Sequence, residues 1–139
     1  MIPPTIRVLV DPADLDVATV HRWLSTDAYW ALGRPLDVVE RAVAGSVNLA
    51  AYDGDDFVGY ARIVTDRATF AWLCDVYVAP AGRGRGVGKT LMDVVRQILD
   101  EGGVQRTLLA TADAHGLYEG YGFAPLTETH KWMLRTHQA

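Results

Sequence analysis

The sequence has a single cysteine, Cys74, in 139 residues, so no disulfide can form within one chain. A small secreted fold held together by disulfides is therefore excluded. No run approaches the roughly 18 apolar residues that a membrane-spanning helix needs. The N-terminal segment contains Pro3, Pro4 and Arg7 and lacks the apolar core of a signal peptide. We therefore expect a cytoplasmic protein without a membrane partner.

An excess of positive charge is also missing, because 17 Asp and Glu residues outnumber 13 Lys and Arg residues and the net charge is −4. A general nucleic-acid binder would need a basic face, so we expect no nucleic-acid partner. We also predict no metal site. A local basic cluster of Arg83, Arg85 and Lys89 leaves room for a small anionic ligand.

The length, the 50% of hydrophobic residues and the 22% of charged residues fit one globular domain, which we place at residues 1–139. Hydrophobic periodicity and turn residues predict the order β-α-α-β-β-β-α-β-α-β. The expected strands span residues 5–10, 47–52, 57–65, 69–78, 107–111 and 130–135, and the expected helices lie near residues 17–24, 36–43, 87–101 and 114–121. Short turns favour antiparallel neighbours and the later β-α-β unit favours a parallel step, so the sheet should be mixed.

The strand at residues 69–78 is almost wholly apolar, which is typical of a strand buried on both faces. Asp75 is its only charged residue. Burial alone would raise the pKa of this carboxyl group and make it a candidate general base; the alternative is a structural carboxylate bonded to the backbone or to an arginine. Cys74 could be a nucleophile, but strand alternation places it opposite Asp75 unless a local bulge interrupts the alternation. A lone strand cysteine is usually a small buried hydrophobic residue.

A glycine-rich segment follows this strand and opens a helix, with the sequence Ala-Gly-Arg-Gly-Arg-Gly at residues 81–86. Glycines allow backbone N–H groups to approach a ligand closely. The N-terminus of a helix adds unpaired N–H donors and partial positive charge. The combination predicts a pyrophosphate site, and Arg83, Arg85 and Lys89 would add charge to it.

Four interpretations of this loop are open. A P-loop would fit Gly88-Lys89-Thr90, but its first glycine would fall on Arg83. A dinucleotide fold needs Gly-x-Gly-x-x-Gly, whereas the spacing here is Gly84-x-Gly86-x-Gly88. The pattern Arg/Gln-x-x-Gly-x-Gly/Ala is matched without a gap by Arg83, Gly86 and Gly88. A flexible turn with helix-capping glycines is the fourth interpretation.

A second motif lies further along the chain, at residues 114–123, Ala-His-Gly-Leu-Tyr-Glu-Gly-Tyr-Gly-Phe. It resembles the A-x-x-L-Y-x-x-x-G-F signature of the GNAT acetyltransferase superfamily, and the Arg83 to Gly88 loop precedes it in the order that family uses. Residues 47–134 share the resemblance, which is far more specific than either motif alone. It implies an α/β (α+β) fold with a central mixed, mostly antiparallel sheet of six to seven strands flanked by about four helices.

The resemblance also implies a set of cofactor contacts. In that family the strand before the glycine loop parts from its neighbour at a bulge, and pantetheine pairs with the exposed strand. Residues matched to the acetyl-CoA site in this way are Val76, Tyr77, Val78, Arg83, Gly84, Arg85, Gly86, Val87, Gly88 and Lys89. Thr111 stands where many members have an asparagine that helps to hold the cofactor. A hydroxyl group there can still form a hydrogen bond.

Tyr118 matches the tyrosine that commonly protonates the departing CoA thiolate, and its ordinary pKa of about 10 suits that step. We expect an acetyl-CoA-dependent N-acetyltransferase in which a primary amine of a small acceptor attacks directly in a ternary complex. Asp75 or a chain of water molecules would be the base. The alternative is a non-catalytic acyl-CoA-binding sensor module. The chain would act as a monomer or a homodimer.

The acceptor site is predicted from a loop before the second helix, where Tyr29 and Trp30 are adjacent and Arg34 follows. In this fold the first two helices border the acceptor cleft. An aromatic wall can hold an aliphatic stem or stack on a cationic amine, and Arg34 could pair with a carboxylate. The alternative is that both aromatics close the core under the loop and Arg34 is exposed.

Overall fold

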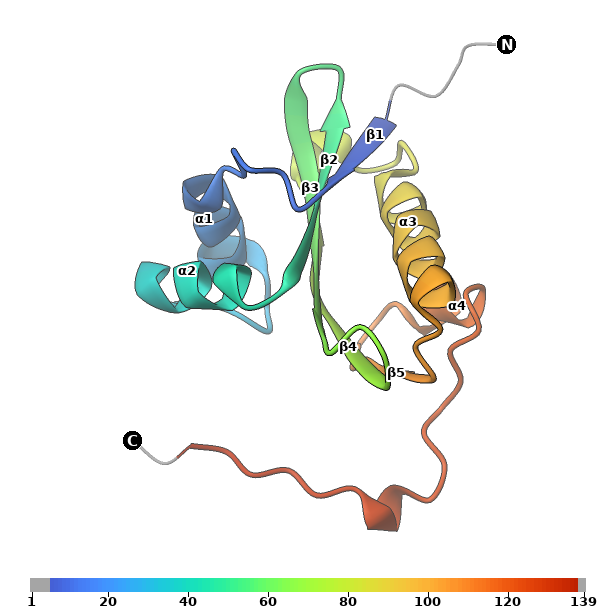
Figure 1. The fold of residues 1–139 in the computed structure, drawn as a ribbon. Helices are drawn as coiled ribbons and strands as arrows, with labels where there is room; N and C mark the ends of the chain where they lie inside the picture. The colour runs from blue at the N-terminus through green and yellow to red at the C-terminus, as the bar shows by residue number, and fades with distance from the viewer. Residues whose placement is uncertain (1–5, 138–139) are drawn as a thin grey trace, which may run out of the picture.

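The computed structural model describes residues 6–137 and places one five-stranded sheet between two helical layers (Figure 1). The elements are β1 (Ile6–Val10), α1 (Val17–Asp27), α2 (Leu36–Ala44), β2 (Val47–Asp53), β3 (Asp56–Thr65), β4 (Phe70–Val78), a 3-10 turn (Pro80–Gly82), α3 (Val87–Gly102), β5 (Arg106–Leu108), α4 (His115–Glu119) and a second 3-10 turn (Thr129–Lys131). Thr5, which was expected to open the first strand, lies outside the described residues.

The sheet has the strand order β1-β2-β3-β4-β5. The pairs from β1 to β4 are antiparallel, and β4 pairs with β5 in parallel. The predicted α/β (α+β) class and the mixed, mostly antiparallel sheet with four helices are therefore confirmed. The expected six to seven strands are wrong for the described residues, in which five strands form.

The helices cover the two faces of the sheet separately, with α1 and α2 on one side and α3 and α4 on the other (Figure 1). Helix α3 buries the stripe of Val87, Leu91 and Val95 against the sheet, as its spacing predicts. Gly59 of β3 allows this close approach, since a Cβ atom there would lie 2.8 Å from Cγ1 of Val87. The start of α3, and with it the glycine loop, is thereby fixed against the sheet.

A bulge interrupts β4 at Asp75. Tyr60 pairs with Tyr77 and Arg62 pairs with Cys74, so β4 has one more residue than β3 across this stretch. Asp75 has φ 53°, in the left-handed region that a non-glycine residue rarely adopts. Leu73 packs in the core below α3, whereas Tyr77 packs in the core below α1. The alternation used to place Cys74 and Asp75 on opposite faces is therefore wrong, because it does not continue through the bulge.

The pairing of β4 with β5 ends early. Only Phe70 to Trp72 pair with Arg106 to Leu108, and β4 then continues alone on that side to Val78. The predicted strand at residues 107–111 accordingly stops at Leu108. Beyond this point β4 and the segment after β5 diverge. Among residues 6–137, that segment has no ladder partner.

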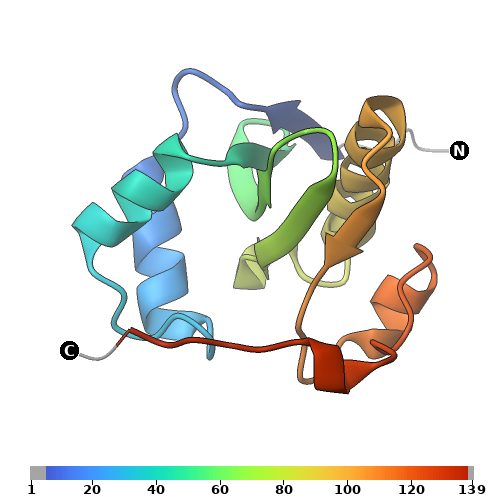
Figure 2. The ribbon, with the colours of Figure 1, turned by 60° about the horizontal axis from the view of Figure 1, so that its bottom comes forward.

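The predicted last strand at residues 130–135 is also wrong. Thr129–Lys131 form a 3-10 turn, and the chain then continues without secondary structure to residue 137. This segment runs from the α4 side of the molecule toward the α1 side without joining the sheet (Figures 1 and 2). A strand requires a neighbouring edge, and within the described residues this segment pairs with none. In residues 6–137, no helix has the length and apolar character needed to cross a membrane.

Candidate active site

The divergence of β4 from β5 produces a cavity of about 420 Å³. Its walls come from the loop between α1 and α2, from residues 72–76 of β4, from the segment after β5 and from α4. The cavity brings together six of the residues predicted from the sequence: Tyr29, Trp30, Asp75, Val76, Thr111 and Tyr118. Candidate residues that lie far apart in the sequence, such as Tyr29 and Tyr118, thus share one site.

Tyr118 lies on α4 and is partly buried, with its ring edge-on to Phe123 at 6.0 Å between centroids. Burial raises the pKa of Tyr118, and the nearby Tyr29 and Asp113 raise it further. The phenol is protonated at neutral pH with or without this shift, as a proton donor must be, and the shift makes it a weaker acid. Thr111 Oγ1 accepts a hydrogen bond of 3.1 Å from the backbone N–H of Ala114, which fixes the start of α4.

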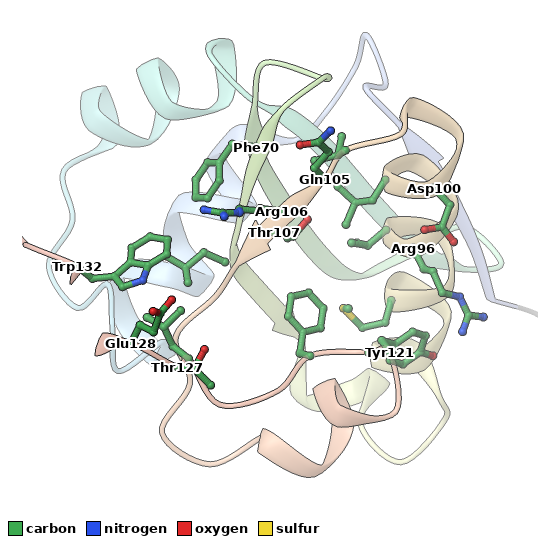
Figure 3. A pocket seen from close by; sticks show the side chains of 18 residues that line it. Phe70, Arg96, Asp100, Gln105, Arg106, Thr107, Tyr121, Thr127, Glu128 and Trp132 are labelled. Atoms are coloured by element: carbon green, nitrogen blue, oxygen red, sulfur yellow. The ribbon is translucent and has the colours of Figure 1, made fainter. Parts of the chain in front are cut away.

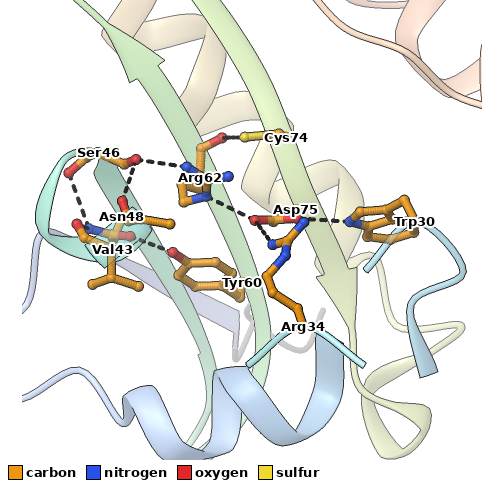
Figure 4. Close-up of polar contacts among 10 residues, drawn as sticks. Trp30, Arg34, Val43, Ser46, Asn48, Tyr60, Arg62, Cys74 and Asp75 are labelled. Carbon is orange, nitrogen blue, oxygen red and sulfur yellow. Dashed lines mark hydrogen bonds and ion pairs between the residues drawn. The ribbon is translucent and has the colours of Figure 1, made fainter. Parts of the chain in front are cut away.

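Asp75 is held by three donors (Figure 4). Its Oδ2 accepts hydrogen bonds from Arg62 Nε at 2.8 Å and Arg34 Nη1 at 2.9 Å, and its Oδ1 accepts one from Trp30 Nε1 at 2.8 Å. The side chain is only 2% exposed.

Burial alone would raise the pKa of Asp75, but the charges of Arg62 and Arg34 and the hydrogen bonds from Arg62 and Trp30 outweigh it, so the pKa is below its usual value. Burial thus acts in the expected direction, but the net pKa is lowered. The geometry is that of the alternative interpretation, a carboxylate bonded to arginine.

Arg62 was not singled out in the sequence, although it is central to this network. It also donates to Ser46 Oγ at 3.0 Å, and Ser46 lies next to β2. The signal was available, since Arg62 is the only charged residue in the otherwise apolar segment 57–65. The same reasoning that selected Asp75 in its own strand would have found its partner.

Cys74 lines the same cavity, and burial raises the pKa of its thiol to about 11. At neutral pH almost all of this thiol is protonated, and a thiol is a much weaker nucleophile than a thiolate. The Sγ atom also lies 3.6 Å from the carbonyl oxygen of Arg62. The site therefore disfavours a covalent route through Cys74.

Two of the three predicted acceptor residues, Tyr29 and Trp30, line the cavity, whereas Arg34 is not part of its lining. Tyr29 is 54% exposed and Trp30 is 41% exposed, and their rings meet edge-on at 4.9 Å. Tyr29 Oη accepts a hydrogen bond of 3.0 Å from the backbone N–H of Ala112, so the α1–α2 loop contacts the segment after β5. Neither ring simply closes the core. Arg34 contacts Asp75 behind them and is largely covered.

The glycine loop has the geometry expected at a phosphate site. Gly84 and Gly86 have φ of 79° and 80°, and a Cβ atom at either position would meet nothing within 4 Å. Gly86 is the N-cap of α3, and no side chain caps the helix there. The first N–H groups of α3 are thus free of a side-chain cap and lie beside open space.

Two of the three basic residues predicted to contact the ligand form ion pairs with acidic side chains. Arg83 Nη2 contacts Asp27 Oδ2 at 2.9 Å, and Arg85 contacts Asp53. Asp27, which the sequence analysis did not select, also accepts a hydrogen bond of 2.6 Å from Tyr77 Oη. These contacts tie the loop to α1 and to β2. Lys89 is exposed on the first turn of α3.

These features fit acetyl-CoA. The half of β4 beyond Trp72 has no β5 partner, so its backbone could pair with an extended pantetheine arm. The uncapped start of α3 offers donors for a pyrophosphate. Within residues 6–137, no group of three or more His, Cys, Asp or Glu side chains is placed to hold a metal ion.

Comparison with known proteins identifies the family of the chain. Residues 17–123 match the sequence model of the acetyltransferase (GNAT) family. A protein from Gibberella zeae, assigned as an acetyltransferase, is 28% identical over 131 residues, which cover 80% of this chain and 74% of that protein.

Two solved structures are similar over nearly the whole chain. A GNAT-family protein from Xanthomonas campestris pv. campestris, assigned as an acetyltransferase, is 43% identical with a TM-score of 0.91, covering 96% of this chain and 94% of that one. A GNAT-family acetyltransferase from Streptococcus pneumoniae is 25% identical with a TM-score of 0.71, covering 96% and 98%. The chain belongs to the GNAT family of acetyltransferases.

Proposed function

We propose that this protein is an acetyl-CoA-dependent N-acetyltransferase of the cytoplasm that acetylates a primary amine of a small acceptor by direct attack in a ternary complex. One observation carries the proposal. The separation of β4 from β5 after Trp72 creates a cavity that exposes the free side of β4 and is lined by Tyr118. A thioester lying along β4 would have a proton donor beside its sulfur.

The cofactor contacts follow from this placement. Val76, Tyr77 and Val78 supply strand backbone for the pantetheine arm. The N–H groups from Arg83 to Lys89 and the Lys89 side chain face the pyrophosphate. Arg83 and Arg85 then act through their ion pairs with Asp27 and Asp53, which hold the loop open at its two glycines. Thr111 positions the start of α4.

The reaction needs few groups from the protein. The neutral amine attacks the thioester carbonyl carbon, the C–S bond breaks, and the sulfur takes a proton from the Tyr118 hydroxyl. The amine loses a proton to solvent through a chain of water molecules, and the Tyr118 phenolate regains a proton from solvent before the next turnover. Most of the rate enhancement then comes from holding the two reactants together in alignment, with proton donation adding about 100-fold or more.

Asp75 has a positioning role in this scheme. A carboxylate with a lowered pKa that already accepts three hydrogen bonds is a poor base. It orients Trp30 and Arg34 at the wall next to the cavity instead. Because Tyr29 and Trp30 are both exposed there, we propose an acceptor whose amine is attached to an apolar body that rests on these two rings.

The test is a panel of primary amines with release of the CoA thiol as the readout. The proposal predicts thiol release that depends on the amine and matches the acetylated amine in amount. Thermal unfolding with CoA is measured on the same preparation. A CoA-induced rise in Tm, with no turnover on any amine of the panel, would favour the sensor module.

A further inference from the structure

The lining of the active-site cavity offers a ligand negative charge and no positive charge. Among the described residues that form its walls, Asp75 and Asp113 are acidic, and none is a lysine, an arginine or a histidine. Arg34 and Arg62 hold the carboxylate of Asp75, but neither of them lines the cavity, so their charge stays behind the wall. The ionised group that a ligand meets in this cavity is therefore Asp113.

Asp113 is available to bind a ligand. It lies in the segment between β5 and α4, and its side chain is exposed. Within residues 6–137 it forms neither a hydrogen bond nor an ion pair. The pKa of Tyr118 is raised first by burial and then by the electrostatic effect of Tyr29 and Asp113. Asp113 is thus close enough to the proposed proton donor to act on a molecule that is bound beside it.

Aromatic rings lie around this carboxylate. Tyr29, Trp30 and Trp72 line the same cavity, and Trp72 is 49% exposed. The hydrogen bond from the backbone N–H of Ala112 to Tyr29 Oη fixes the tyrosine ring beside the segment that carries Asp113. A protonated amine is attracted both to a carboxylate and to the faces of aromatic rings, and an alkyl chain packs well on such rings.

The charge of this lining is not shared by every hollow of the molecule. A cavity of about 510 Å³ beside α3 has charged residues of both signs in its walls, namely Arg96, Arg106, Asp100 and Glu128 (Figure 3). The acidic composition of the chain as a whole therefore does not account for the lack of basic residues at the active site. The aromatic rings and the single available carboxylate are particular to the active-site cavity.

We propose that this cavity binds an acceptor amine that carries a second positive charge, in the simplest case an α,ω-diamine whose distal ammonium group contacts Asp113 and the aromatic rings. The inference rests on the proposed N-acetyltransferase function and names its substrate class. The near nitrogen, in its neutral form, forms the amide bond as the C–S bond breaks, and the CoA sulfur takes the proton of Tyr118. The distal nitrogen keeps its proton throughout.

The product differs from the substrate in charge. After one transfer, the acetylated end of the diamine is a neutral amide and the other end is still a cation. A second transfer would require the neutral amide to replace the ammonium group at Asp113. We therefore expect one acetyl group per diamine.

The test compares three series of acceptors with the same chain lengths, from propyl to hexyl: α,ω-diaminoalkanes, n-alkylamines and ω-amino acids. Release of the CoA thiol at one pH gives kcat/KM, and mass spectrometry gives the number of acetyl groups added. We expect the best diamine to exceed its alkylamine by about 10-fold or more, which is above the statistical advantage of two equivalent amino groups. The ω-amino acids, with a carboxylate in place of the second ammonium group, should be the poorest series.

Two variants test the role of Asp113. Asp113→Asn keeps the size of the side chain and removes its charge, so the ratio of kcat/KM for the diamine and the alkylamine should fall to the statistical advantage alone. The ratio is the measured quantity, because a change in the pKa of Tyr118 affects both acceptors alike. Asp14→Asn is the matched control, since Asp14 is an exposed residue before α1 and lies outside the cavity. It should keep the ratio of the wild type.

The outcomes separate this inference from the proposed function. Alkylamines or amino acids that react as well as the diamines, or a ratio that Asp113→Asn leaves unchanged, overturn the inference and leave the acetyltransferase function in place. A control that loses the ratio as well also overturns it. Calorimetric titration of diaminohexane into the CoA-bound protein is the second measurement. Binding that requires Asp113 without thiol release overturns the proposed function alone, and a lack of both binding and release overturns both.

Discussion

The indole nitrogen of Trp30 donates a hydrogen bond of 2.8 Å to Oδ1 of Asp75, although the two residues are 45 positions apart. One lies in the exposed loop between α1 and α2, and the other forms the bulge that opens β4. The bond therefore connects the proposed acceptor wall to the strand that would hold the thioester. Asp75 remains charged although it is buried, because Arg34 and Arg62 also contact its carboxylate.

Replacing Asp75 with asparagine should destabilise the protein while leaving the pH profile of turnover unchanged for the folded molecules. Removal of one partner from a buried charge network leaves the others uncompensated and costs about 3 kcal/mol. Urea unfolding and a kcat against pH profile on one preparation measure both quantities. A variant as stable as the wild type that loses the acidic limb of the profile would instead identify Asp75 as the base.

The wild type and Asp75→Asn should also differ in how the free energy of unfolding depends on pH. Asp75 has a pKa below its usual value of 3.8 in the folded state, so its contribution is fully present above that value. The contribution is lost as the pH falls from 3.8 through the lowered pKa. The difference in free energy of unfolding between the wild type and Asp75→Asn should therefore be constant near neutral pH and shrink below 3.8. A constant difference down to the acid transition contradicts this.

Gly86→Asp should abolish CoA binding, because it places a negative charge where the pyrophosphate would lie. The φ of 80° at Gly86 means that any side chain also strains the loop. Gly86→Ala carries the same strain without the charge and is the matched control. We expect a CoA-induced rise in Tm for the wild type, a smaller one for Gly86→Ala and none for Gly86→Asp. Equal shifts in all three proteins would place the pyrophosphate elsewhere.

The acceptor wall can be tested with two changes at one position. Trp30→Phe keeps an aromatic face and loses the hydrogen bond to Asp75, whereas Trp30→Ala loses both. If the rings hold the acceptor, KM for the amine should rise about 10-fold or more in Trp30→Ala and less in Trp30→Phe, with CoA affinity intact. Arg34→Ala removes one partner of Asp75 and should act in the same direction. Variants with wild-type KM would remove the loop from the acceptor site.

Local patterns in the sequence were sufficient for some of these features. Strand β4, the glycine loop and α3 are contiguous in the sequence. The residues that end the strand and begin the helix, such as Pro80 and Gly86, lie next to them, so a local pattern predicts the whole unit. The motif containing Tyr118 is equally compact. The β4–α3 unit and this motif therefore predict where the site lies, and in the structure Tyr118 and Asp75 line the same cavity.

Other features depend on partners far along the chain. The charge state of Asp75 follows from Arg62 and Arg34, which are 13 and 41 positions away. The isolated charge of Arg62 in its own strand suggests it as a partner, but the pairing with Arg34 depends on how the α1–α2 loop folds over β4. The bulge that turns Asp75 toward them is a mismatch between two strands and has no signature in β4 alone. The predicted strand at residues 130–135 has suitable residues for a strand, but its formation depends on an edge that the described chain does not bring to it.

The most direct measurement of the central claim is the turnover number of Tyr118→Phe under conditions where chemistry limits the rate. The change removes the hydroxyl group and keeps the ring that packs against Phe123. Tyr52→Phe is the matched control, since Tyr52 lies on β2 outside the cavity. The account predicts that kcat falls about 100-fold in Tyr118→Phe with little change in CoA affinity, and stays near wild type in Tyr52→Phe. An unchanged kcat in Tyr118→Phe would contradict the assignment of Tyr118 as the proton donor.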